Sequence, residues 1–189
     1  GAGSQLTVAS VGQVGLAVGR SGSGVLNIGN GGLASSDYVV VGYSGGSEGV
    51  VNVTGQNSRL EAYTVLYVGQ LGTGEVNVSN GGSVNNATAF IGFYGPGTVN
   101  VSGTGSSLTN SSITYVGYQG TGTLNVTGGA TAHSQNTLYV GFTASGDGTV
   151  KVSGQGSALT TGANYMYIGV KGTGTLDIED GANVSGYHS

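Results

Sequence analysis

One short pattern recurs along this chain at nearly constant spacing. An apolar residue, a usually aromatic residue and a second apolar residue precede a glycine, as in Leu66-Tyr67-Val68-Gly69. Successive glycines of this pattern are 23–28 residues apart. They are Gly19, Gly42, Gly69, Gly92, Gly117, Gly141 and Gly169. Such a period indicates a solenoid, a propeller or an array, in which each unit buries its apolar face against its neighbours.

A second segment follows each glycine and alternates apolar with polar residues, as in Gly97-Thr98-Val99-Asn100-Val101. Alternation of this kind predicts a half-buried strand, so Val99 and Val101 face inward and Asn100 faces outward. By the same parity Leu66 and Val68 face inward and Tyr67 faces outward. Two interior columns are therefore expected: Val18, Val41, Val68, Ile91, Val116, Val140 and Ile168, and Ile28, Val53, Val78, Val101, Val126, Val152 and Ile178.

A third segment alternates between two forms along the chain. One form is typified by residues 103–109 and contains Gly-x-Gly, and the other is typified by residues 80–84 and contains Gly-Gly. Three short strands per ~25 residues, without helical periodicity, predict an all-β, single-stranded parallel β-helix of about seven to eight coils. A propeller is the alternative, because a pair of units has the length of one four-stranded blade. The β-helix is favoured, since each single unit already repeats.

The repeat fills the whole chain, so residues 1–189 are expected to form one continuous β-helical segment. Gly1 to Thr7 already match the Gly-x-Gly form, and Ser189 lies where the next tripeptide should begin. We therefore expect a section of a longer array.

Composition narrows the possible functions. The chain has 41 glycines among 189 residues, but only four Lys or Arg and eight Asp or Glu. Four basic residues cannot form the basic face that nucleic acid requires. There is no cysteine for a disulfide or a thiolate metal site, and no apolar run is long enough to insert into a membrane.

The order of these segments resembles a known class of repeats. Apolar-aromatic-apolar-Gly, then Gly-Thr-Val-Asn-Val, then Gly-Gly or Gly-x-Gly-Ser-x-Leu is similar to the repeats of type V secretion (autotransporter) passengers and PEP-CTERM-associated surface proteins. The resemblance covers essentially the whole chain. It implies a β-helical passenger that is secreted or attached to the bacterial outer membrane, and it says little about activity.

Few residues are arranged for catalysis. Polysaccharide-degrading β-helices use clustered carboxylates, and here the only cluster is Asp177, Glu179 and Asp180. These residues form either a weak cation site or a solvated outer ladder beside Lys151. His133 and His188 lack the spacing of metal ligands. We therefore expect no enzyme, no metal and no cofactor, with a polysaccharide-binding or polysaccharide-degrading rod as a distant alternative.

Outward aromatic residues give the candidate binding site. They can form a structural ladder, or a stripe that contacts sugars or another protein. The first column contains Tyr67, Phe90, Tyr115, Tyr139 and Tyr167, and around the next corner lie Tyr43, Phe93, Tyr94, Tyr118 and Phe142. A column of Asn52, Asn77, Asn100 and Asn125 is expected to form a stacked amide ladder.

These observations predict a non-catalytic section of a secreted or cell-surface protein that acts as a rigid stalk and adhesive surface. Its partners would be a host matrix protein, a glycan or like molecules, bound through weak multivalent contacts. The alternative is a purely structural spacer that presents an active region elsewhere.

Overall fold

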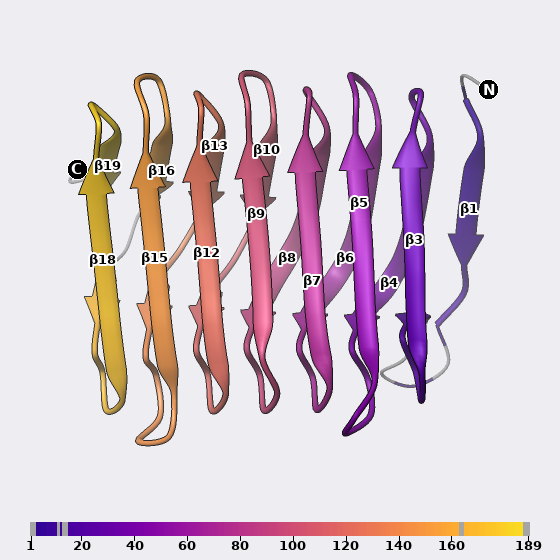
Figure 1. The fold of residues 1–189 in the computed structure, drawn as a ribbon, viewed down its shortest axis with the longest axis horizontal. Coiled ribbons are helices and arrows are strands. Elements are labelled where there is room, and N and C mark those ends of the chain that lie inside the picture. Colours follow the sequence, from indigo (N-terminus) through magenta and orange to yellow (C-terminus); the bar gives the residue numbers. More distant parts are fainter. Residues whose placement is uncertain (1–2, 11, 13–14, 163–164, 187–189) are drawn as a thin grey trace.

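The computed structural model describes residues 3–10, 12, 15–162 and 165–186, and within them every regular element is a β-strand. Successive coils lie side by side along the long axis of the molecule (Figure 1). All strand pairs are parallel, and each coil hydrogen-bonds to the next. The predicted parallel β-helix is therefore confirmed.

Two sheets form opposite sides of the coil, and one of them has a single strand from each turn. This seven-stranded sheet contains β3 (Ser23–Gly29), β5 (Glu48–Thr54), β7 (Thr73–Ser79), β9 (Gly97–Ser102), β12 (Thr121–Thr127), β15 (Asp147–Ser153) and β18 (Thr173–Glu179). The twelve-stranded sheet contains β1 (Gln5–Val8), β2 (Leu16–Val18), β4 (Leu33–Val41), β6 (Arg59–Val68), β8 (Ser83–Ile91), β10 (Ser107–Asn110), β11 (Thr114–Val116), β13 (Thr131–Ser134), β14 (Leu138–Val140), β16 (Ala158–Thr161), β17 (Met166–Ile168) and β19 (Asn183–Gly186).

The number of strands per coil changes along the rod. The coils that begin with β9, β12 and β15 have three strands each, as predicted: one in the seven-stranded sheet and two in the twelve-stranded sheet. In the coils that begin with β3, β5 and β7 the two strands of the twelve-stranded sheet are merged into one long strand, which is β4, β6 or β8. In β8 only Ala87 and Thr88 separate the inward residues Asn86 and Ala89, and the strand continues through the bend. Three residues separate Asn110 from Thr114, and the strand breaks there, whereas β6 has the same three-residue interval between Ala62 and Leu66 and stays continuous.

The two sequence forms of the third segment correspond to two turn geometries. Asn80 and Gly81 are consecutive residues with positive φ, 54° and 84°. A turn of this kind needs φ > 0 at both central residues, which explains the Asn-Gly pair. In the other form Gly103 and Gly105 have positive φ while the residue between them does not. The alternation in the sequence is thus an alternation of turn types along one edge of the rod.

The glycine that ends each tripeptide is needed for close approach between coils. A Cβ atom at Gly69 would overlap the carbonyl oxygen of Pro96, and the φ of Gly69 is +77°. Any other residue would strain the backbone and push the next coil away.

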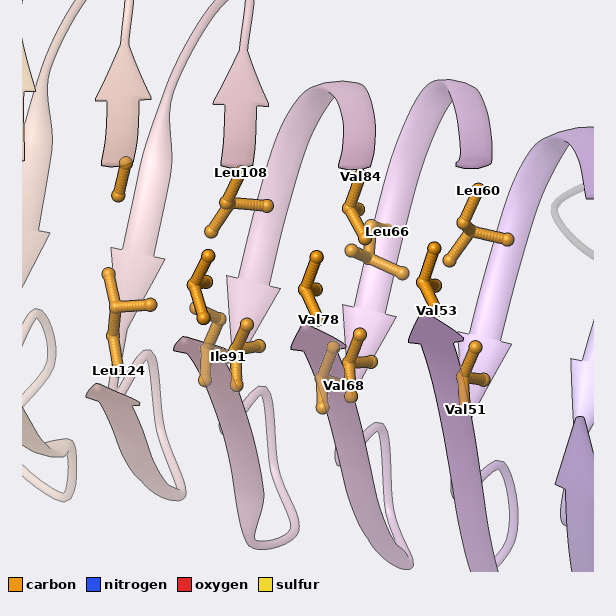
Figure 2. Packing of buried hydrophobic residues seen from close by; sticks show 14 of the residues in the cluster. Val51, Val53, Leu60, Leu66, Val68, Val78, Val84, Ile91, Leu108 and Leu124 are labelled. Carbon is orange, nitrogen blue, oxygen red and sulfur yellow. The ribbon is translucent and has the colours of Figure 1, made fainter. Parts of the chain in front are cut away.

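The core consists of in-register apolar columns between the sheets. Figure 2 shows Leu60, Leu66 and Val68 pointing toward the space that Val51 and Val53 also enter. Both predicted columns are buried from Val18 to Val140 and from Ile28 to Val152. Their last members differ, because Ile168 and Ile178 are 41% and 50% exposed. No described coil stacks beyond these two residues.

A polar seam inside the core was not predicted. Asn86, Asn110, Ser134 and Thr161 are register partners in successive coils and are all buried. The amide Nδ2 of Asn110 donates to Thr114 Oγ1 at 2.5 Å, and Thr114 Oγ1 donates to Ser134 Oγ at 3.0 Å. Sequence alternation alone does not indicate which of the neighbouring asparagines 85 and 86 faces inward.

Two leucines test the assignment of the core. Leu66 is fully buried and Leu71, five residues later, is 54% exposed. We expect Leu66→Ala to lower the free energy of unfolding by about 2–5 kcal/mol, because it removes buried contacts and leaves a cavity. Leu71→Ala should change it by less than about 0.5 kcal/mol. Chemical denaturation followed by circular dichroism measures both, and equal effects would contradict the assignment.

Candidate functional site

Eight aromatic residues form one continuous cluster on the outer surface, which we call the aromatic flank. In-register pairing of β6, β8, β11, β14 and β17 places its first row one ring per coil. The rows are Tyr67, Phe90, Tyr115, Tyr139 and Tyr167, and Phe93, Tyr118 and Phe142.

Rings within each row are stacked. Ring centroids in the first row are 4.8–5.4 Å apart, with interplanar angles of 3–14°. In the second row the centroids are 5.1 and 5.3 Å apart. These distances follow the ~4.8 Å spacing of neighbouring strands, so the backbone sets the ring spacing.

The two rows also pack against each other edge to face. Tyr115 contacts Tyr118 at a centroid distance of 5.3 Å and an angle of 89°, and Phe142 at 5.1 Å and 78°. Phe90 contacts Phe93 and Tyr118 in the same way. Edge-to-face and offset-stacked rings are the favourable arrangements of aromatic quadrupoles, each worth about 0.5–1.5 kcal/mol beyond the buried area.

This packing decides which parts of the rings can contact a partner. The rings within the rows are half-buried, and Tyr167 at the end of the first row is 42% exposed. The faces of the inner rings lie against neighbouring rings, so solvent reaches mainly their edges and hydroxyl groups. The ring centroids of Tyr94 and Phe93 are 4.4 Å apart, and Tyr94 is 51% exposed. Tyr94 therefore extends the flank around the corner of the coil.

Tyr43 was predicted to belong to this surface, and the structure separates it from the flank. Gln70 lies between Tyr43 and Phe93 in the succession of coils, as the backbone hydrogen bonds of these residues show. The guanidinium carbon of Arg20 lies 5.8 Å from the centroid of the Tyr43 ring. Tyr43 therefore makes a cation–π contact with Arg20 that is separate from the aromatic flank.

Two phenols of the flank, Tyr67 and Tyr115, are held in their neutral form. Burial raises the pKa of Tyr67 above 10.0, and the neighbouring Tyr38 and Tyr94 raise it further. Burial also raises the pKa of Tyr115, with added contributions from Tyr139 and Tyr118. The flank consists of tyrosines and phenylalanines alone, so its polar groups are hydroxyls.

The predicted amide ladder is confirmed on the outer face of the other sheet, and it also includes Asn27. Each side-chain Nδ2 donates to the Oδ1 of the asparagine one coil earlier, at 2.8, 3.1, 2.8 and 2.8 Å. The ladder contains Asn27, Asn52, Asn77, Asn100 and Asn125. Because these amides bond to one another, they have fewer donors and acceptors to offer a ligand.

In the acidic cluster of Asp177, Glu179 and Asp180, one carboxylate forms an ion pair with Lys151 of the preceding coil. Lys151 pairs with Asp177 in register, but its Nζ lies 2.8 Å from Glu179 Oε2. That hydrogen bond and the charge of Glu179 raise the pKa of Lys151, and Asp177 and Asp180 add to the effect. Among the residues that the structure describes, no group of three or more His, Asp or Glu side chains is placed to hold a metal ion.

The second histidine of the sequence analysis, His188, lies outside the described residues. His133 hydrogen-bonds through Nδ1 to Thr160 Oγ1 at 2.8 Å and through Nε2 to Gln135 Oε1 at 3.1 Å. Within the described ranges, no helix has the length and apolarity that crossing a membrane requires.

Comparisons with protein-family models, with curated proteins and with solved structures gave no match.

Two exposed aromatic residues, Tyr63 and Tyr165, were missed by the sequence analysis. Tyr63 in β6 is 59% exposed and lies off the flank. The signal was available, because the segment from Leu60 to Val68 is one residue longer than its counterpart from Val84 to Ile91. An extra residue in one strand forms a bulge, which changes the direction in which a side chain points.

The packing of the flank predicts different costs for two tyrosines. Tyr115→Ala should lower the free energy of unfolding by about 2–4 kcal/mol, because Tyr115 is packed between four flank rings. Tyr94→Ala should cost less than about 1 kcal/mol, since Tyr94 packs on Phe93 alone among the flank rings. Urea denaturation of both variants measures this, and a costly Tyr94→Ala with a harmless Tyr115→Ala would contradict the packing.

Alkaline pH tests the burial of the phenols. Because the folded-state pKa of Tyr67 and Tyr115 lies above the unfolded value of about 10, the unfolded chain loses these protons first. The free energy of unfolding should therefore be constant below pH 10 and fall as pH rises through the folded-state pKa values. The double variant Tyr67→Phe, Tyr115→Phe should show a smaller fall. An equal fall in both proteins would show that these phenols are not protected.

Proposed function

We propose that this chain is a non-catalytic section of a bacterial secreted or cell-surface β-helical passenger that acts as a rigid stalk and an adhesive surface. The aromatic flank carries the proposal. It runs along several consecutive coils, is uncharged, and has partly exposed ring edges and hydroxyls.

A linear array of similar contacts suits weak multivalent adhesion. Each ring edge and hydroxyl offers a small contact, and the stacked coils repeat that contact at a constant spacing. When several weak sites bind one surface, the later contacts form at high effective concentration. Tyr94 and Tyr167, which are 51% and 42% exposed, are more exposed than the inner rings and are the strongest individual anchors of the flank.

A spacer without binding of its own is the second candidate, and one observation favours it. The rings of the flank cover one another's faces, which is the arrangement that stabilises the rod itself. In that case the aromatic residues serve only the stiffness of the stalk.

An adhesion assay separates the two candidates. Beads that display many copies of the protein are tested on immobilised collagen and on a glycan array. The flank variant combines Tyr94→Ser with Tyr115→Phe and Tyr139→Phe, which removes exposed groups and keeps the ring stacking. Val25→Ser is the matched control, because Val25 is 64% exposed and belongs to β3 in the other sheet.

Adhesion that falls at least tenfold in the flank variant, with Val25→Ser unchanged, supports an adhesive flank. Equal adhesion of all three proteins contradicts it. If the beads bind neither surface and sedimentation shows no self-association, the chain is a spacer.

A further inference from the structure

A bulge in β6 turns one tyrosine away from the coil. Ala62 pairs with Asn86, and the register resumes only at Val65 with Thr88, so β6 has one residue more than β8 in this interval. Tyr63 and Thr64 occupy the bulge and are exposed. The Tyr63 hydroxyl donates to Glu61 Oε2 at 3.0 Å, which holds the ring beside the outer face of the strand.

A hollow of about 320 Å³ lies next to this ring and crosses three coils. Tyr63 and Glu61 contribute from β6, Asn85 and Ala87 from β8, and Thr109 from β10, with Ser111 just after that strand. No residue of the aromatic flank lines it. The volume is at the lower end of the range for small-molecule sites.

A second hollow continues the same side of the rod. It has a volume of about 500 Å³ and is lined by His133, Gln135, Thr160 and Ser185, among others. Thr109 of the first hollow pairs in register with His133 of the second. One polar column therefore runs through both hollows, which together we call the trough: Glu61, Asn85, Thr109, His133, Thr160 and Ser185.

The chemistry of the trough favours an uncharged, hydroxyl-rich ligand. Its column presents amide, hydroxyl and imidazole groups, which both donate and accept hydrogen bonds. Among the described residues that line the trough, the one carboxylate is Glu61, and it is compensated by Arg59, whose Nε lies 3.2 Å from Glu61 Oε1. Tyr63 adds a side chain that is 59% exposed, whereas the inner rings of the aromatic flank are half-buried against one another.

We propose that the trough binds an extended neutral polysaccharide along the rod axis, with one sugar residue stacked on Tyr63. The polar column repeats with the coil spacing of ~4.8 Å, close to the length of one pyranose residue in an extended chain. Each coil then meets one sugar. The carboxylate of Glu61 accepts from a sugar hydroxyl, and the Asn85 amide and the Thr109 hydroxyl contact the residues that follow.

This site is independent of the adhesive function proposed for the aromatic flank. Tyr63 and Val25 make a matched pair for the test, because both are exposed, 59% and 64%, and Val25 lies on β3 in the other sheet, outside both proposed surfaces. None of Tyr63→Ala, Val25→Ala and Tyr94→Ala removes a buried side chain, so all three variants should fold.

Isothermal titration calorimetry with soluble cello-, xylo- and chito-oligosaccharides provides the test. We expect a hexaose of at least one series to bind, with an affinity at least tenfold above that of its disaccharide. Tyr63→Ala should weaken binding at least tenfold, Tyr63→Phe less, and Val25→Ala should leave it unchanged.

Three results would overturn the proposal: no saturable binding in any series, equal affinity of hexaose and disaccharide, or unchanged binding by Tyr63→Ala. Loss of binding in Tyr94→Ala with retention in Tyr63→Ala would move the glycan to the flank. The collagen and glycan-array assay of the flank variant is read separately, so either proposal can fail alone.

Discussion

Each coil hydrogen-bonds in register to the next, and the other features of the rod depend on that pairing. Parallel strands place equivalent residues ~4.8 Å apart, so any residue type that recurs in the repeat becomes a column. Valines become the apolar interior, asparagines become an amide ladder, and tyrosines and phenylalanines become stacked rings. The glycine at the end of each tripeptide lets the backbones approach closely enough for this pairing.

The same pairing limits what the surface can bind. Columns of identical residues bond to one another, so the amides of the ladder and the ring faces of the flank are largely engaged within the rod. Where the column changes residue type or the register shifts, side chains of different chemistry lie next to one another, and only some of them bond within the rod, as Tyr63 does to Glu61 and His133 to Thr160. Tyr63 in the bulge and the mixed polar column that begins at Glu61 are such places, which is why the glycan site is placed there.

Much of this architecture could be predicted from the sequence, because alternation and period determine which residues face inward. The interior columns, the amide ladder and the positions of the first aromatic row follow from these two signals. The merged strands could not be predicted, since β6 and the pair β10 and β11 have equally many residues at the bend and only β6 is continuous. The edge-to-face packing of the second row and the inward turn of Asn86 depend on side-chain geometry that the pattern does not contain.

Distances between spin labels test the coil stacking most directly. The chain has no cysteine, so pairs of engineered cysteines can be labelled without background. Val25 is an outward position in register with Thr123, Thr149 and Thr175, four, five and six coils away. Pairing Val25→Cys with each threonine in turn should give distances that rise by ~4.8 Å per coil, from about 19 to about 29 Å. Distances that fail to rise by a constant step would contradict the stacked rod.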